Sequence, residues 1–169
     1  MRLTPFDEGA QACLAPDLVF DGTRGDFALA ALDAAVNPAG LRSEEALKTA
    51  VLICLMTDRR VDSTELREGD RNRGWPGDSF DMRAGDHVLG SRLWLLRRRA
   101  LTDETILAAE DYAREALQPL VDQGAFVRFD VTVTADKPRS RLQIAVAGYG
   151  RDGVQTFDDR FMILWDQIA

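Results

Sequence analysis

The spacing of the apolar residues changes once along this chain, at Phe126, and that change limits the fold more than any other feature. Upstream, two segments repeat apolar residues three and four positions apart, as on one face of an α-helix. Downstream, AFVRFDVTVTA and RLQIAVAGY alternate apolar and polar residues, RFMILW does so less cleanly, and the turn sequences DKPRS and GRDG lie between them. We therefore expect an α+β fold in which two main helices pack on a small C-terminal antiparallel β-meander, residues 126–166. Its strands are predicted at roughly 126–134, 140–147 and 160–165.

The two helices carry signals for their ends as well as for their buried faces. The first is predicted over 43–57, with Ser43 as the N-cap. The second begins after Thr102, carries Pro119 in its last turn and ends at Gly124. The expected buried stripes are Ala46, Leu47, Ala50, Val51, Cys54 and Leu55 in the first helix, and Ile106, Ala109, Tyr112, Ala113, Ala116, Leu117 and Leu120 in the second.

Residues 1–42 are rich in turn-forming sequence. Two short apolar segments, Leu18–Phe20 and Phe27–Leu29, flank DGTRGD and indicate an N-terminal hairpin. The length of 169 residues favours a single domain, 1–169.

Composition excludes several classes of protein. The net charge of -7 disfavours a general nucleic-acid binder, because phosphate attraction dominates that affinity. Cys13 and Cys54 form no CxxC pair and there is one histidine, so we expect no disulfide framework, no metal site and no cofactor. The N-terminus lacks a secretory pattern, and the run AVLICLM is too short to span a bilayer, so no membrane partner is expected.

The segment 58–92 is long, polar and glycine-rich, which is typical of functional loops. Tryptophan and arginine, the residue types enriched at interface hot spots, gather in and just after it. We therefore predict that 58–92 is a docking loop for protein partners. The candidate interface residues are Arg59, Arg60, Arg71, Arg73, Trp75, Arg92, Trp94, Arg97 and Arg98. Two alternatives stay open: intramolecular salt bridges around one structural tryptophan, and a nucleic-acid patch, which the acidic remainder of the chain disfavours.

Enzymatic patterns are weaker. GDHVLGSR spaces its glycines like a phosphate-binding loop but lacks the lysine and the preceding strand. Carboxylates for glycoside hydrolysis are available at Glu65, Glu68, Asp70 and Asp78, which makes a lysozyme-like hydrolase the alternative function. His87 has no evident nucleophile beside it, so we expect no catalytic residue and no enzyme.

Four blocks of sequence carry a family resemblance. In order they are TAVLICLMTDRR, DRNRGWPGD, GSRLWLLRRR and the helix containing YAREALQPLVDQG. Together they resemble the Mu-like phage baseplate wedge protein family, and RFMILW fits the end of that family's meander. The resemblance covers about residues 15–166, although Pro76 stands where family members usually have a second tryptophan.

This resemblance implies a structural subunit of a contractile tail baseplate. The expected site is a six-fold ring that links spike or hub, tail tube and other wedge subunits to the first disc of sheath, in a virion assembled in the bacterial cytoplasm. Related sheath-initiating proteins, which include a T-even wedge component once labelled a tail lysozyme, carry a Glu-Pro-Arg motif after the long helix. Here the same place reads LVDQGAFVRF, and Arg128 alone matches its charge and joins the candidate interface residues. As sheath subunits link by exchanged strands, an edge of the 126–165 sheet is expected to accept a sheath arm.

Overall fold

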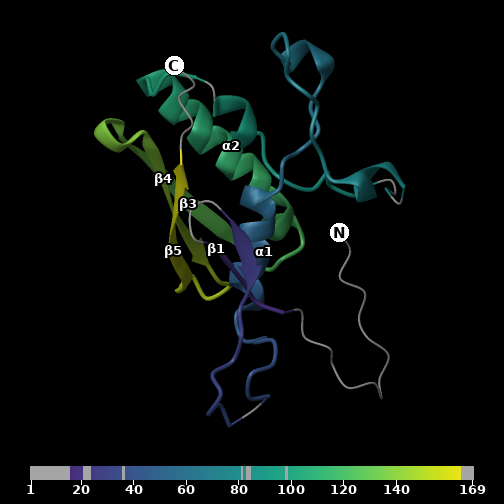
Figure 1. The fold of residues 1–169 in the computed structure, drawn as a ribbon, viewed down its shortest axis with the longest axis vertical. Coiled ribbons are helices and arrows are strands. Elements are labelled where there is room, and N and C mark those ends of the chain that lie inside the picture. Colours follow the sequence, from purple (N-terminus) through teal and green to yellow (C-terminus); the bar gives the residue numbers. More distant parts are fainter. Residues whose placement is uncertain are drawn as a thin grey trace.

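The computed structural model describes residues 16–20, 24–35, 37–80, 82, 85–97 and 99–164. Its elements confirm the α+β expectation: β1 (Leu18–Phe20), β2 (Gly25–Phe27), α1 (Ala46–Met56), α2 (Asp103–Asp122), β3 (Arg128–Asp136), β4 (Arg141–Tyr149) and β5 (Gln155–Leu164). The three-stranded sheet lies along one side of α2, and the loop between α1 and α2 projects from the other side (Figure 1). No helix in the described part of the chain is long and apolar enough to cross a membrane.

Helix α2 follows its sequence signals closely. The Thr102 hydroxyl accepts a hydrogen bond from the backbone N–H of Thr105, and Asp103 and Glu104 occupy the positive end of the helix dipole. Gly124 adopts a φ of +74° and ends the helix. The predicted stripe is buried at Ala109, Ala113, Ala116, Leu117 and Leu120, and half-buried at Ile106 and Tyr112.

Helix α1 departs from the prediction at its first turn. It begins at Ala46, and the residue at the cap position is Glu45, whose side chain makes no cap hydrogen bond, so the prediction of Ser43 as N-cap is wrong. Leu47 is 44% exposed and Ala46 is exposed, because the first turn extends beyond the core. The buried face is formed instead by Thr49, Val51, Leu52, Cys54 and Leu55.

The C-terminal strands form a meander of order β3-β4-β5 with antiparallel neighbours, as predicted. Val131 and Val133 pair with Val146 and Ile144, and these four side chains are buried on the face that meets α2. Strand β5 starts at Gln155, five residues before the predicted start, because the β4-β5 turn closes with the Gly150 N–H bonded to the Val154 carbonyl at 2.9 Å. The last tryptophan of the predicted third strand, Trp165, lies outside the described residues.

Phe126 seals one end of the core between α2 and the sheet. It is 2% exposed, and its ring centroid lies 4.5 Å from that of Phe129 and 6.2 Å from that of Phe157. A Cβ added at Gly148 would lie 2.6 Å from the Phe126 ring, so glycine at this position allows the ring to lie against β4.

The predicted N-terminal hairpin is present. β1 and β2 pair antiparallel, with Leu18 opposite Phe27, and the second strand ends at Phe27 rather than Leu29. Leu29 forms an isolated bridge with Leu41 farther along the segment.

Candidate functional site

The two ends of the 58–92 loop are joined at its base. The backbone N–H of Ser91 donates to the Thr57 carbonyl at 2.9 Å, and the N–H of Arg59 donates to the Ser91 carbonyl at 2.9 Å. The Ser91 hydroxyl, which is buried, donates to the Leu55 carbonyl at 2.6 Å. Gly90 has a φ of +102°, and a Cβ there would lie 2.4 Å from the Thr57 carbonyl oxygen. The sequence therefore closes the loop tightly against the end of α1.

Trp94 fills the space under this base. It lies in a 3-10 helix (Leu93–Leu96) whose four residues are all buried, and it is itself 8% exposed. Its indole N–H donates to the Arg59 carbonyl at 2.9 Å, and the Arg73 guanidinium lies 6.0 Å from the ring centroid. Trp94 thus packs in the core and, through the hydrogen bond to Arg59, also fixes the first residues of the loop.

Glu115 of α2 ties two predicted interface arginines to the body. Its carboxylate accepts from Arg59 Nη1 at 2.9 Å and from Arg92 Nη2 at 2.7 Å. Arg92 also reaches Glu65 at 3.0 Å and stacks 4.3 Å from the centroid of the Tyr112 ring. Burial alone would lower the pKa of Arg92, but the hydrogen bonds to Glu115 and Glu65 outweigh it and raise that pKa.

A second carboxylate, Asp58, gathers two more arginines. Arg73 lies 3.0 Å from one Asp58 oxygen and Arg97 lies 4.0 Å from the other. Arg98 lies outside the described residues. The base of the loop therefore brings Arg59, Arg73, Arg92, Trp94 and Arg97 together, and intramolecular contacts hold all five, as the salt-bridge alternative anticipates.

Beyond the base, Asn72 divides the loop into two lobes. Its side-chain amide bonds both backbone groups of Val61, with Nδ2 donating to the carbonyl at 2.7 Å and Oδ1 accepting from the N–H at 3.1 Å. The lobe 62–71 is polar and contains a 3-10 helix (Ser63–Glu65). The lobe 73–89 contains a second one (Pro76–Ser79). The parts of the two lobes that carry these 3-10 helices stand away from the body in Figure 1.

Several exposed residues of the loop lie outside the cluster at its base. Arg60 and Arg71 are exposed, and neither makes an ion pair with another described residue. Trp75 is 48% exposed, and two residues that sequence reasoning missed accompany it: Phe80 at 84% and Met82 at 43%. Large apolar side chains in the polar stretch DSFDM were the available signal.

Arg128 belongs to the sheet and is not among the residues that the loop base gathers. Its guanidinium stacks 4.0 Å from the centroid of the Tyr149 ring and lies 3.4 Å from Asp130. The hydrogen bond to Asp130 raises the pKa of Tyr149 above its ordinary value. Arg128 and Asp130 are solvent-exposed at the start of β3, and Tyr149 is half-buried at the end of β4.

Of the four carboxylates considered for hydrolysis, three make ion pairs or hydrogen bonds within the loop. Glu65 pairs with Arg92, Asp70 accepts the Arg67 N–H at 3.1 Å, and Asp78 accepts the Leu89 N–H at 3.3 Å. Glu68 is exposed. Three of these acids thus help to fold the loop itself.

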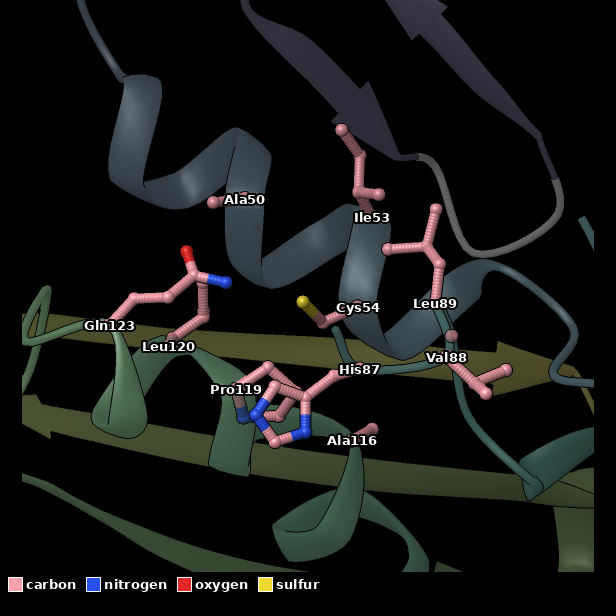
Figure 2. Close-up of a pocket in the computed structure, with 11 residues that line it drawn as sticks. Ala50, Ile53, Cys54, His87, Val88, Leu89, Ala116, Pro119, Leu120 and Gln123 are labelled. Atoms are coloured by element: carbon pink, nitrogen blue, oxygen red, sulfur yellow. The ribbon is translucent and has the colours of Figure 1, made fainter. Parts of the chain in front are cut away.

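An open apolar pocket lies between α1, α2 and the end of the loop (Figure 2). Its apolar lining includes Ile53, Cys54, Val88, Leu89, Pro119 and Leu120. The Cys54 sulfur points into the space between the two helices, and burial raises the pKa of this thiol to about 11. At the rim, His87 Nε2 lies 3.2 Å from an Asp122 carboxylate oxygen.

The comparisons with known proteins agree with the resemblance seen in the sequence. A family model described as "Phage protein GP46" matches residues 47–155. The chain is 40% identical to baseplate protein gp46 of Escherichia phage Mu over 109 residues. The aligned part makes up 63% of this chain and 68% of the Mu protein. It is also 37% identical over 107 residues to Mu-like prophage FluMu protein gp46 of Haemophilus influenzae, and this aligned part makes up 63% of this chain and 70% of that protein. The chain therefore belongs to the phage protein GP46 family.

Proposed function

We propose that this chain is a structural subunit of the baseplate of a contractile phage tail or a tail derived from one. The observation that carries the proposal is the 40% identity to a protein named as a baseplate protein. The family match runs over α1, the 58–92 loop, α2, β3 and β4, which are the parts that build the candidate interface.

Within the baseplate, we assign the chain to the wedge or inner ring. The whole chain, 1–169, acts there as one domain that links spike or hub, tail tube and wedge proteins to the first sheath disc. Six copies surround the tube in the virion, after assembly in the host cytoplasm. The sequence resemblance supports this assignment, as does a loop whose tip is too apolar to be ordinary solvated surface.

The 58–92 loop is the proposed contact with neighbouring wedge proteins. Arg59, Arg73, Arg92, Trp94 and Arg97 hold its base, and Arg60, Arg71 and Trp75 are exposed for contact. Arg98 and Arg128 complete the proposed interface. Such a loop binds well when its base is rigid, because less conformational entropy is lost on docking.

For the sheath contact we propose strand addition at β5. The sheet has two outer strands, β3 and β5, among the described residues. The edge of β3 is partly occupied by α2, because Glu110 accepts the Val133 N–H at 3.1 Å and Arg114 donates to the Val131 carbonyl at 3.3 Å. β5 is therefore the better acceptor for an extended arm of a sheath subunit.

A structural role also accounts for the loop acids better than hydrolysis does. Glycoside hydrolysis needs two carboxyl groups that flank a substrate cleft, one of them with a raised pKa. Glu65 is instead neutralised by Arg92, and Asp70 and Asp78 accept backbone hydrogen bonds. We accordingly propose that the protein is not an enzyme.

Deletion of the gene from the phage or prophage that encodes it tests the function. Electron microscopy should show tail tubes without attached sheath, and a plasmid copy should restore complete tails. Normal tails from the deletion strain would refute the proposal. Proline substitutions at successive positions of 156–163 test the strand contact: those that leave the monomer folded should fail to restore sheath, and Lys137→Pro in the exposed turn between β3 and β4 serves as the control.

A further inference from the structure

The contacts of β3 reveal which residues of the sheet point their backbone groups outward. Glu110 accepts the Val133 N–H at 3.1 Å, and this N–H therefore points away from β4. Arg114 donates to the Val131 carbonyl at 3.3 Å on the same side. In an antiparallel ladder, residues that bond to the neighbouring strand alternate with residues that do not. The even-numbered residues of β3, such as Thr132, therefore bond to β4.

The same alternation continues across the sheet to β5. Ala145 faces an even-numbered residue of β3 and bonds to that strand, so the next residue, Val146, bonds to β5. Val146 faces Asp159, whose backbone groups are accordingly used by β4. The backbone groups of Asp158 and Arg160 then point to the outer edge. A strand added to β5 would have to bond to these groups.

The Arg160 N–H is already bonded within the chain. Asp159 Oδ1 accepts it at 2.8 Å. The other carboxylate oxygen, Oδ2, lies 2.8 Å from Nζ of Lys48 in α1. The hydrogen bond to Asp159 raises the pKa of Lys48, so the ammonium group stays charged. One carboxylate thus joins α1 to the outer edge of β5 and uses the N–H that an incoming strand would need.

Asp159 also places a charge on the inner side of an edge strand. It faces Val146, which is buried, and Phe157, two residues before it on the same face, packs against the core. Inward-pointing charges on outer strands are a known means by which sheets avoid pairing edge to edge. The position of Asp159 is therefore typical of a residue that protects an edge.

We propose that Asp159, held by Lys48, is a movable guard that keeps the β5 edge closed to strand pairing until an incoming strand displaces it. The two side chains are 27% and 34% exposed, so water can solvate them when a side-chain rotation releases the Arg160 N–H. On β3, in contrast, Glu110 covers the Val133 N–H from a helix packed on the strand. The guard follows from these contacts alone, whereas its displacement by a sheath arm rests on the proposed strand addition at β5.

Two valine variants of the purified full-length chain test the guard. Asp159→Val removes the acceptor of the Arg160 N–H. Asp158→Val, at the exposed neighbouring position, makes the same change of charge and side chain but leaves that acceptor in place. The Arg160 amide should exchange with deuterium roughly five-fold faster in Asp159→Val, as expected for the loss of one hydrogen bond, and at the wild-type rate in Asp158→Val. Sedimentation at rising concentration should show stronger self-association of Asp159→Val, because β5 of a second copy can pair with the opened edge.

Two further variants separate strand pairing from a general loss of charge. Arg160→Pro added to Asp159→Val removes the edge N–H and should restore the monomer while circular dichroism stays unchanged. Asp159→Asn keeps an oxygen that can accept the Arg160 N–H, so this variant should stay monomeric even if the proline variant does not fold.

Equal exchange of the Arg160 amide in the two valine variants would overturn the proposal. So would equal self-association of the two, including none in either. Both measurements use the free protein, whereas the sheath contact is tested by the β5 proline variants in assembled tails. A failure of the guard and a failure of the sheath contact are therefore distinguishable.

Discussion

Asp17 attaches the N-terminal segment to the body of the protein. Its side chain is fully buried, and its carboxylate accepts hydrogen bonds from the N–H groups of Glu44 at 3.0 Å and Glu45 at 2.7 Å. Arg42 Nε donates to the same carboxylate at 2.9 Å. Asp17 thus caps the start of α1 from a distant part of the sequence, which is the function that Ser43 was expected to have.

Replacement of Asp17 by asparagine should destabilise the fold. An amide cannot accept all three hydrogen bonds and removes the charge opposite Arg42, so we expect a loss of about 1–3 kcal/mol in the free energy of unfolding. Urea denaturation at pH 7 measures it. Asp33→Asn, at an exposed position of the same segment, is the matched control and should change the stability by less than about 0.5 kcal/mol.

Because the Asp17 carboxylate is ionisable, the stability of the fold should also depend on pH. Burial would raise the pKa of Asp17, but the hydrogen bonds from Glu44, Glu45 and Arg42 together hold it below the ordinary value of 3.8. Near that pH the unfolded chain binds more protons than the folded one, so stability rises with pH. The stabilisation by ionised Asp17 is complete above the pKa that this residue has in the unfolded chain, and it is lost as the pH falls through the lower pKa that it has in the folded protein. The difference between wild type and Asp17→Asn should therefore shrink below about pH 4; a constant difference from pH 6 to pH 3 would contradict this.

Two glycines of the loop provide a matched pair of substitutions that tests how tightly the base of the loop is closed. Gly85 and Gly90 both have positive φ, at +96° and +102°, but only Gly90 has a backbone oxygen within 4 Å of an added Cβ. Gly85→Ala should cost only the strain of the left-handed backbone, about 1–2 kcal/mol. Gly90→Ala should cost roughly 1–3 kcal/mol more, since the Thr57 carbonyl must move. Equal melting temperatures for the two variants would show that the base is not tightly closed.

At the level of elements, Glu115 couples helix α2 to the base of the loop. Glu115→Gln removes the charge that holds Arg59 and Arg92. Because these groups are about one-third exposed, we expect a modest loss of stability, about 1 kcal/mol or less. The larger effect should be local: the amides of Arg59 and Ser91, which close the base, should exchange with deuterium faster.

Glu104→Gln is the control for this prediction, because Glu104 is exposed on the first turn of the same helix. It should leave exchange at Arg59 and Ser91 unchanged. In the wild type, both lobes beyond Asn72 should exchange quickly, because few of their backbone groups are buried. Unchanged exchange at the base in Glu115→Gln, or strong protection throughout 70–90 in the free protein, would contradict the described loop.

The elements that sequence predicted well are those governed by neighbouring residues. The N-cap Thr102, the terminating Gly124 and the alternation in β3 and β4 are local signals, and all of them hold. The start of α1 was missed because its cap comes from Asp17, far away in sequence.

The sequence predicted which segment carries the candidate site, but not which contacts its residues make. Sequence identified the arginine- and tryptophan-rich segment, but the pairing of Arg59 and Arg92 with Glu115 depends on how the loop folds back on α2. The burial of Trp94 agrees with its leucine neighbours Leu93, Leu95 and Leu96, whereas Phe80, which stands between polar residues in DSFDM, was not singled out.

On the scale of the whole molecule, the protein combines a packed body with surfaces suited to assembly. Helices α1 and α2 and the meander share one core, against which the base of the loop is fixed. The exposed apolar residues of the loop, the open pocket and the outer edge of β5 lie at its surface. The segment 16–46 lies outside the family match and adds further exposed apolar side chains, Phe27, Leu29, Leu32 and Leu41.

Quantitative mass spectrometry of purified tails tests the proposed baseplate role most directly. Isotope-labelled reference peptides from α2 and β3 would count the copies of this chain against those of the sheath protein. A six-fold ring predicts about six copies per tail, retained after the particles are washed in high salt. Complete, sheathed tails that contain none of this protein would contradict the account.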